Sequence, residues 1–486
     1  MKPYIKSLIP ISILFFSLHS FAKKQESLTN NKPNIIIFFA DDLGWMDLGC
    51  YGSKYYETPN IDILSGQGVR FTNAYSAHPV CGPTRTALLS GQSPIRLNNY
   101  KVNGDLKAEH ITIAESLKEL GYATYFCGKW HMGTNKGRHP VEQGFDTAIG
   151  WNHAGQTGSY FYPYKDEGIE IVLNRKRKLI PKRDIIGFED GEDGEFLTDR
   201  LTQETVKWIT KNKDQPFFIY FSHYSVHTPL QAKEEYVRYF EEKNKKLNLS
   251  TEAIYDTTTK GVYCRKNQSN AIFAANLKSL DDSMGELMAC LKKNKLAENT
   301  IIIFASDNGG YSCSKVPRKL TPTSNFPLNK GKGWMYEGGI KVPTIIKYSG
   351  ALAPGATSDV LVCTYDFYPS ILEMVKSPLK PEQHKDGVSI LKGLKNKDVT
   401  NSRSLFWFHP YPNSAGHRPS AAIRKDYRKL IWFLETDNIV LYDLEHDIEE
   451  KNDLAALHAA TAKEMQQELE NWIIENNIDL SQFQKK

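Results

Sequence analysis

Short, mainly apolar runs recur along the chain, and each run ends in polar residues. Runs of this kind suit β-strands that are buried on both faces of a parallel sheet. Amphipathic or long helical patterns alternate with them, and this alternation predicts an α/β domain. The expected strands cover residues 35–40, 71–75, 122–127, 217–222, 300–306 and 342–348, and the expected helices residues 60–70, 112–120, 197–210, 232–250 and 271–292.

The pattern changes after about residue 395. Short strands separated by turns are expected there, followed by one helix near residues 456–475. We therefore expect a large main domain over residues 23–395 and a smaller antiparallel sheet with a helix over residues 396–486. The expected short strands cover residues 404–408, 420–424, 428–434 and 438–443.

Residues 134–195 depart from the core pattern, because they are rich in glycine, aromatic and charged residues. They are expected to form loops and a small hairpin outside the core. Such an insertion carries specificity in many proteins, and a purely structural flap is the equal alternative.

The N-terminus has the pattern of an export signal. A basic start is followed by an apolar run from Leu8 to Leu18 and by small residues up to Ala22. The run is shorter than the roughly 20 apolar residues of a membrane span. Residues 1–22 are thus predicted to be a signal peptide, and the protein to be periplasmic or secreted without a membrane span.

Composition and charge exclude several classes of protein. With 40% hydrophobic and 24% charged residues, wholesale disorder is not expected. The formal charge is +5, and removal of residues 1–22 lowers it to +3 because Lys2 and Lys6 are lost. This charge is too small to indicate a nucleic-acid partner. The seven cysteines form no zinc-binding spacing, and export would permit disulfides.

The stretch from Cys81 to Gly91 has the form C-x-P-x-R followed by Leu-Ser-Gly. Pro83 favours a helix start and Gly91 a helix end, so Cys81 is expected at a helix N-terminus, where the backbone favours an anion. Arg85 follows one turn later on the same face. The alternative is a buried cysteine near a proline turn, with the arginine in solvent.

Polar residues follow the expected core strands at the edge where α/β sheets bind ligands. Three carboxylates and an amide on two strand ends indicate a site for a hard cation, calcium or magnesium rather than zinc. The alternatives are helix caps, turn pairs and ordinary loops. The residues are Asp41, Asp42, Asp307 and Asn308, with Lys129, His131 and His227 after other strands and Lys332 in a glycine-rich loop.

Taken together and in this order, these motifs resemble those of the formylglycine-dependent type I sulfatases, the arylsulfatase-like members of the alkaline phosphatase-like superfamily. The resemblance covers nearly the whole mature chain. Thr84 departs from it, because the family usually has Ser or Ala there. The resemblance implies a large mixed, mostly parallel sheet between helices, plus a smaller C-terminal antiparallel sheet with a helix.

The resemblance also implies a reaction. A maturation enzyme, either formylglycine-generating or radical, would oxidise Cys81 to an aldehyde, and one hydroxyl of its hydrate would attack the sulfate ester. The implied metal ligands of one Ca²⁺, or Mg²⁺, are Asp41, Asp42, Cys81, Asp307 and Asn308. The implied catalytic residues are Cys81, Arg85, Lys129, His131, His227, Asp307 and Lys332.

Within this reaction the resemblance gives each side chain a role. Asp307 would take the proton of the attacking hydroxyl, and His227 with Lys332 would protonate the leaving alcohol. Arg85, Lys129 and Lys332 would neutralise the sulfate. His131 would then deprotonate the second hydroxyl, so that sulfate leaves.

The expected substrate is a sulfated carbohydrate. Candidate subsite residues, chosen by loop position, are Trp151, His153, Arg318, His409 and His417. The first alternative function is a phosphatase or phosphodiesterase of the same superfamily, which would use Ser or Thr as nucleophile and two zinc ions. The second is a silent glycan-binding relative, which the filled catalytic positions argue against.

Overall fold

The computed structural model describes most of the chain. The predicted signal peptide and Arg318 lie outside the described residues. Within them, no helix is both long and apolar enough to cross a membrane. The described ranges are residues 32–101, 103–133, 135–165, 184–316, 321–395 and 402–483, with the backbone alone of residues 169–173 and 176–180.

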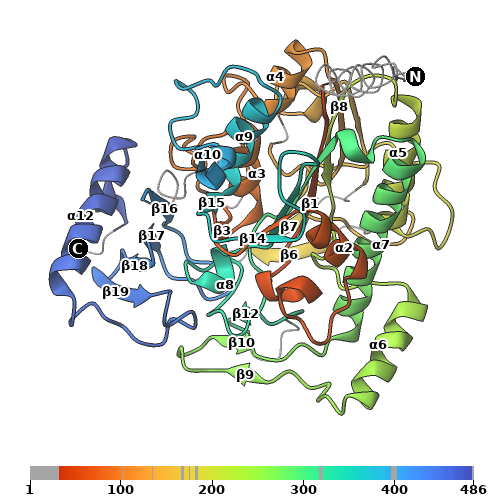
Figure 1. Ribbon diagram of the computed structural model, residues 1–486. Coiled ribbons are helices and arrows are strands. Elements are labelled where there is room, and N and C mark those ends of the chain that lie inside the picture. The colour runs from red at the N-terminus through yellow and green to blue at the C-terminus, as the bar shows by residue number, and fades with distance from the viewer. Residues whose placement is uncertain are drawn as a thin grey trace, which may run out of the picture.

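A mixed, mostly parallel sheet of eight strands forms the centre of the molecule (Figure 1). The five strands from β11 (Thr300–Ser306) to β5 (Thr147–Ile149) are parallel to one another, whereas β13 (Thr344–Lys347) runs antiparallel to both of its neighbours. The predicted fold class is therefore confirmed. The strand order is β14 (Ala356–Ser358), β2 (Val69–Phe71), β13 (Thr344–Lys347), β11 (Thr300–Ser306), β1 (Asn34–Ala40), β8 (Phe217–Ser222), β4 (Ala123–Gly128) and β5 (Thr147–Ile149).

Helices cover both faces of this sheet. The side chains of β1 alternate between the two faces, and each face packs against helices in a separate hydrophobic core. Ile36 and Phe38 face one core, and Ile35 and Ile37 face the other. On the first face lie α2 (Pro59–Gln67), α5 (Leu197–Lys211) and α7 (Ala271–Lys293), with α6 (Glu234–Lys246) beside α7; on the second lie α3 (Cys81–Ser90), α4 (Ile113–Glu119), α9 (Phe367–Met374) and α10 (Ile390–Lys395).

The single strand expected over residues 71–75 is wrong. The chain turns at Thr72 and Asn73, where the Asn73 side chain donates to the Asp359 carbonyl at 3.0 Å. This turn separates β2 of the main sheet from β3 (Ala74–Tyr75), which pairs with β15 (Val362–Cys363).

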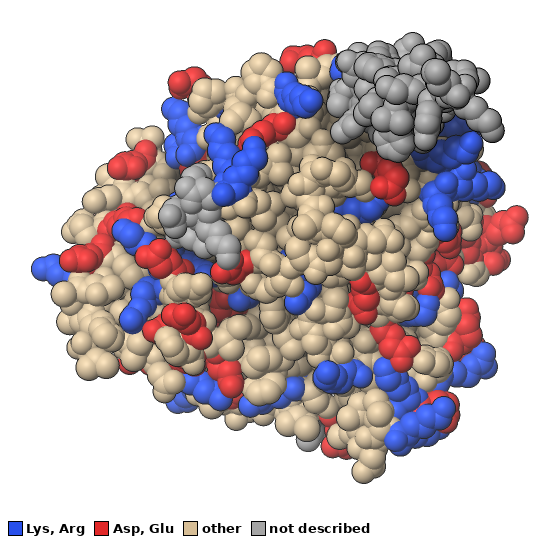
Figure 2. All heavy atoms as spheres, in the orientation of Figure 1, with Lys and Arg blue, Asp and Glu red and all other residues tan. Residues whose placement is uncertain are grey.

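Smaller elements surround the core. The excursion over residues 134–195 contains the expected hairpin, formed by β6 (Ile169–Leu173) and β7 (Lys176–Ile180). A three-stranded sheet of β9 (Tyr255–Asp256), β10 (Tyr263–Arg265) and β12 (Cys313–Ser314) is crossed by the disulfide Cys264–Cys313. On the face shown in Figure 2, Lys and Arg are interspersed with Asp and Glu, in keeping with the small net charge.

The C-terminal subdomain is an antiparallel sheet with one helix, as predicted (Figure 1). One face of the sheet packs on α12, and the other packs on the main domain, where the Trp407 indole donates to the Ser76 carbonyl at 2.8 Å. Its elements are β16 (Ser404–His409), β17 (Ser420–Lys425), β18 (Arg428–Phe433), β19 (Asn438–Asp443) and α12 (Ala459–Glu475).

A buried ion cluster joins the two parts of the chain. The Lys429 ammonium on β18 lies 2.9 Å from Glu337 Oε1 and 2.6 Å from Glu450 Oε1, and all three side chains are fully buried. Glu337 opens the short helix α8 (Glu337–Ile340) of the main domain. Burial alone would raise the pKa of Glu337, but the positive charges of Lys429, Lys341 and Arg424 together outweigh burial and lower it.

His223 follows β8 and lies in the core between the rings of Phe38 and Phe221, at centroid distances of 4.5 and 4.1 Å. Burial lowers the pKa of His223 to about 3. The folded protein therefore holds this imidazole neutral at pH values where the unfolded chain binds a proton, with a pKa of about 6.5. Because the pKa is lower in the folded than in the unfolded protein, His223 contributes to the free energy of unfolding fully above pH 6.5. This contribution falls as the pH drops from 6.5 toward the folded-state pKa.

We expect the stabilising contribution of His223 to fall by about 2 kcal/mol between pH 8 and pH 5. Urea unfolding of wild type and His223→Gln at both pH values measures this, because the stability difference between them should shrink by that amount. The matched control is His446→Gln at an exposed position. A stability difference for His223→Gln that does not change with pH would contradict the prediction.

Candidate active site

Two polar pairs meet at the carboxyl edge of the sheet. Strand β1 leads into Asp41-Asp42 and its parallel neighbour β11 into Asp307-Asn308, with Ala40 opposite Ser306. The Asn308 amide donates to Asp42 Oδ1 at 2.8 Å, and the Asp42 backbone N–H donates to Asp307 Oδ1 at 3.1 Å. All four side chains are buried. The expected meeting of the two strand ends is confirmed.

Cys81 is the first residue of α3, and Gly91 ends the helix in the left-handed region, with φ of 70°. The Cys81 thiol is buried, and its Sγ lies 3.2 Å from His131 Nδ1. Ligand atoms of Asp41, Cys81 and Asp307 all lie within 4.8 Å of one another. The nucleophile candidate and the carboxylates therefore share one site.

Thr84, the departure from the sulfatase pattern, holds the segment before this helix. Its hydroxyl donates to the His78 carbonyl at 2.9 Å and accepts from the His78 backbone N–H at 3.1 Å. The hydroxyl thus fixes the approach of the chain to Cys81.

Arg85 is fully buried, so the alternative of a solvent-exposed arginine is wrong. Its Nε and Nη2 atoms donate to Asp307 Oδ2 at 2.9 and 2.7 Å. The Ser222 hydroxyl at the end of β8 accepts from Arg85 and donates to the Lys129 carbonyl at 2.7 Å. Sequence reasoning missed Ser222, although its place at the end of a core strand is the same signal that identified Asp41.

The end of β4 supplies a lysine and a histidine. Gly128 has φ of 107°, and a Cβ there would lie 1.8 Å from the Ser222 carbonyl oxygen, so only glycine fits. The Lys129 ammonium lies 2.6 Å from Asp41 Oδ2. His131, with φ of 53°, turns back toward Cys81.

Lys332 and His227 approach the same carboxylate from the open side. Lys332 Nζ lies 2.5 Å from Asp42 Oδ1, and His227 Nε2 lies 3.6 Å from Asp42 Oδ2. The side chains of Lys332 and His227 are 16% and 13% exposed, whereas Arg85 and Lys129 are fully buried. Lys332 and His227 are therefore the site's contacts with solvent. His227 Nδ1 donates to the Thr228 carbonyl at 2.7 Å, which leaves Nε2 to exchange a proton.

Burial and neighbouring charges set the protonation of these groups. Burial raises the pKa of Asp41. At Asp42 burial acts in the same direction, but the nearby positive charge, above all that of Lys332, outweighs it and lowers the pKa. Burial, together with Lys332, lowers the pKa of His227 to about 3, and burial with Lys129 lowers that of His131. Both imidazoles are therefore neutral at pH 7 in this structure.

The residues fit a hard divalent cation. Asp41 Oδ1 and Asn308 Oδ1 are buried and accept no hydrogen bond. Such oxygens are costly to bury without a partner. With carboxylates and an amide as the donors, the set suits calcium or magnesium rather than zinc.

The predicted subsite residues lie in two places. Trp151 is buried and packs edge-on against the exposed His153, with ring centroids 5.1 Å apart. Their loop covers the site, because a Cβ at Gly155 would lie 2.5 Å from His131 Cε1. Sequence reasoning also missed Asn103, whose Oδ1 lies 3.5 Å from His131 Nε2.

His409 and His417 lie in the C-terminal subdomain. Both are buried and stack on each other, with centroids 4.6 Å apart. His409 is the last residue of β16 rather than part of a loop. Their role in substrate binding stays a prediction, and so does that of Arg318.

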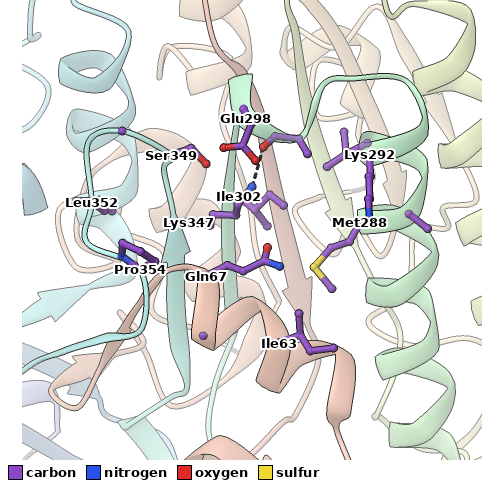
Figure 3. Close-up of a pocket in the computed structure, with 15 residues that line it drawn as sticks. Ile63, Gln67, Met288, Lys292, Glu298, Ile302, Lys347, Ser349, Leu352 and Pro354 are labelled. Carbon is purple, nitrogen blue, oxygen red and sulfur yellow. Dashed lines mark hydrogen bonds between the residues drawn. The ribbon is translucent and has the colours of Figure 1, made fainter.

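A cavity of about 670 Å³ lies elsewhere, between α2, α7 and the amino end of β11 (Figure 3). In it the Lys347 ammonium donates to the Ala297 carbonyl at 2.7 Å. Asp307 follows the carboxyl end of β11, so this cavity is at the opposite edge of the sheet from the carboxylates.

A buried nucleophile candidate among carboxylates and three cations, at the carboxyl edge of an α/β sheet, defines a hydrolase of anionic esters. The chain belongs to the sulfatase family, because the family model "Sulfatase" matches residues 33–377. A second model, "N-sulphoglucosamine sulphohydrolase, C-terminal", matches residues 330–478. The enzyme is thus a sulfuric ester hydrolase, and the phosphatase alternative is not favoured.

Several relatives support the assignment. A sulfatase of Formosa agariphila is 31% identical, over 92% of this chain and 90% of its own length. The N-acetylgalactosamine-6-O-sulfatase of Bacteroides thetaiotaomicron is 29% identical, over 96% and 98%. The crystal structure of Ps i-CgsB is 31% identical with a TM-score of 0.75, covering 92% of this chain and 94% of its own. It has also been solved in complex with k-i-k-neocarrahexaose.

Proposed function

We propose that this sulfatase removes sulfate from a sulfated carbohydrate, with residue 81 in its formylglycine form and one calcium ion. The main support for this proposal is that Cys81, three cations and three carboxylates converge at the carboxyl edge of the sheet. The carbohydrate class is supported by the names of relatives, which include an N-acetylgalactosamine-6-O-sulfatase and a protein crystallised with a neocarrahexaose.

Two groups complete the proposed site, and the Cys81 thiol stands in for the first. Formylglycine would supply the hydroxyl of a hydrated aldehyde as nucleophile, and calcium would supply positive charge that lowers the pKa of that hydroxyl. The residues that would hold calcium are Asp41, Asp42, Asp307, Asn308 and residue 81.

The other side chains handle charge and protons in this proposal. Arg85, Lys129 and Lys332 are fixed cations that neutralise the sulfate oxygens. Asp307 accepts a proton from the nucleophile, and His131 Nδ1 accepts one from residue 81 in the second half of the reaction. His227 Nε2, beside Lys332, delivers a proton to the leaving alcohol, and the negative charge of the bound ester raises the imidazole pKa for this step.

A substrate screen tests the function. We expect release of inorganic sulfate from at least one sulfated mono- or oligosaccharide, formylglycine in the mass spectrum of the peptide containing residue 81, and one calcium per chain by elemental analysis. Unmodified cysteine throughout active enzyme, or two bound zinc ions, would contradict the proposed chemistry.

His227→Ala should harm carbohydrate sulfates far more than activated aryl sulfates. A sugar alcohol needs a proton in the transition state, whereas a nitrophenolate leaves without one. We expect a loss on the order of 10²–10⁴-fold in kcat on the carbohydrate substrate and a much smaller loss on nitrophenyl sulfate. His446→Ala is the control, and equal losses on both substrates would contradict the assignment.

We also propose export to the periplasm or medium, maturation of Cys81 by a formylglycine-generating or radical enzyme, and division of the chain at residues 395–396. The absence of a long apolar helix among the described residues is compatible with export.

A further inference from the structure

The loop that carries Lys332 is tied to both halves of the site by backbone hydrogen bonds. The Lys332 N–H donates to the Gly310 carbonyl at 3.0 Å, just after the Asp307-Asn308 pair that follows β11. The Gly333 N–H donates to the Pro79 carbonyl at 2.7 Å, just before Cys81. Both of these bonds are made to segments of the main domain.

The C-terminal subdomain also holds this loop. Asn413 Nδ2 donates to the Gly333 carbonyl at 3.0 Å, and the Trp334 indole donates to the Ala415 carbonyl at 3.0 Å. Gly333 has φ of 84°, and a Cβ there would lie 2.4 Å from Asn413 Nδ2. The two segments are therefore in close contact directly beside Lys332.

The Asn413 side chain is itself fixed. Its Oδ1 accepts from the backbone N–H groups of Ala415 and His417, at 3.0 and 3.2 Å. The His417 ring in turn donates to the His409 carbonyl at 3.0 Å and stacks on the His409 ring. With Oδ1 occupied in this way, Nδ2 faces the Gly333 carbonyl and also lies 3.5 Å from His409 Nε2.

We propose that Asn413 is a positioning residue for Lys332. The proposal rests on the proposed function, in which Lys332 neutralises the sulfate and assists the leaving group. The lysine side chain is long and flexible, so the backbone of residues 332–333 sets where its ammonium can reach. A displacement of about 1 Å in such a group can cost on the order of 100-fold in rate.

The decisive variant is Asn413→Asp. An aspartate can keep the acceptor for Ala415 and His417, but it loses the donor and turns an oxygen toward the Gly333 carbonyl oxygen. Ser414→Asp is the matched control, because it adds the same charge at the next, exposed position. The Ser414 backbone carbonyl, which accepts from Lys315, is kept in this variant.

We expect Asn413→Asp to lower kcat/KM on the carbohydrate sulfate about tenfold, and Ser414→Asp to change it less than about twofold. In a Lys332→Ala background, Asn413→Asp should cost less than about twofold more, because the residue that it positions is already gone. A merely structural role would cost the same factor in both backgrounds, and that result would overturn the proposal.

A crystal structure of Asn413→Asp gives a readout that needs no activity. We expect Lys332 Nζ to leave Asp42 Oδ1, from which it lies 2.5 Å in the wild type. An unmoved Lys332 would overturn the inference even if the enzyme is a sulfatase. If the wild-type enzyme hydrolysed no sulfate ester, the proposed function would be contradicted. The crystal structure of Asn413→Asp would still test whether Asn413 positions Lys332.

Discussion

Cys81→Ala is expected to fold like the wild type and to lose sulfate-ester hydrolysis by a factor on the order of 10⁵–10⁶, the scale seen when a covalent nucleophile is removed. The substitution removes the one atom at the start of α3 that reaches both His131 and the carboxylates. Arg85 and Lys129 keep their partners, because their ion pairs with Asp307 and Asp41 do not involve Cys81. Binding should therefore survive while the chemical step is lost.

Kinetics with a sulfated carbohydrate, together with thermal unfolding, check this prediction. The matched control is Cys290→Ala, another buried free cysteine, which lies on α7 away from the site. The control should keep near-wild-type activity. Residual turnover of Cys81→Ala within about a hundredfold of wild type would mean that residue 81 is not the nucleophile.

Lys429→Met is expected to cost about 3–5 kcal/mol of unfolding free energy, because it removes the cation that two buried carboxylates share and leaves Glu337 only the more distant Lys341, at 3.6 Å. Glu337 and Glu450 lie 2.9 and 2.6 Å from the Lys429 ammonium, and none of the three side chains reaches water. Methionine keeps the length of the side chain, so the loss reports charge rather than a cavity. Denaturant unfolding measures it.

The control for this change is Lys425→Met on the neighbouring strand. The Lys425 side chain is 47% exposed and pairs with Glu468 at 2.9 Å. Such a surface pair is worth less than about 1 kcal/mol. Adding Glu450→Gln to Lys429→Met should recover part of the lost stability, since one uncompensated charge is then gone. Equal losses for Lys429→Met and Lys425→Met would refute the role of the cluster.

Much of the site could be predicted because it depends on local signals. Asp41, Asp42, Asp307 and Asn308 each follow a continuously apolar run, and the carboxyl ends of parallel strands share one edge of a sheet. Local sequence patterns do not give the strand order. This order places β11 directly beside β1, although the two strands are far apart in the sequence.

Ser222 carried a local signal that was overlooked, but the other features depend on contacts between distant segments. Asn413 acts on Gly333 only because the C-terminal sheet docks there, and nothing around Asn413 in the sequence signals this contact. His409 and His417 were placed at a binding surface from their loop-like surroundings, yet docking buries both of them. The turn at Thr72 and Asn73 is stabilised by the hydrogen bond from the Asn73 side chain to the Asp359 carbonyl, again a residue from another part of the chain.

The burial of α3 also bears on the order of events during synthesis. Every residue of this helix is buried, and it packs against the turn at Thr364–Asp366 and against α9, which ends at Met374. As the ribosome builds the chain from the N-terminus, Cys81 emerges long before the segments that cover it exist. The maturation enzyme that we propose would therefore have to reach the Cys81 thiol before the second half of the protein folds over it.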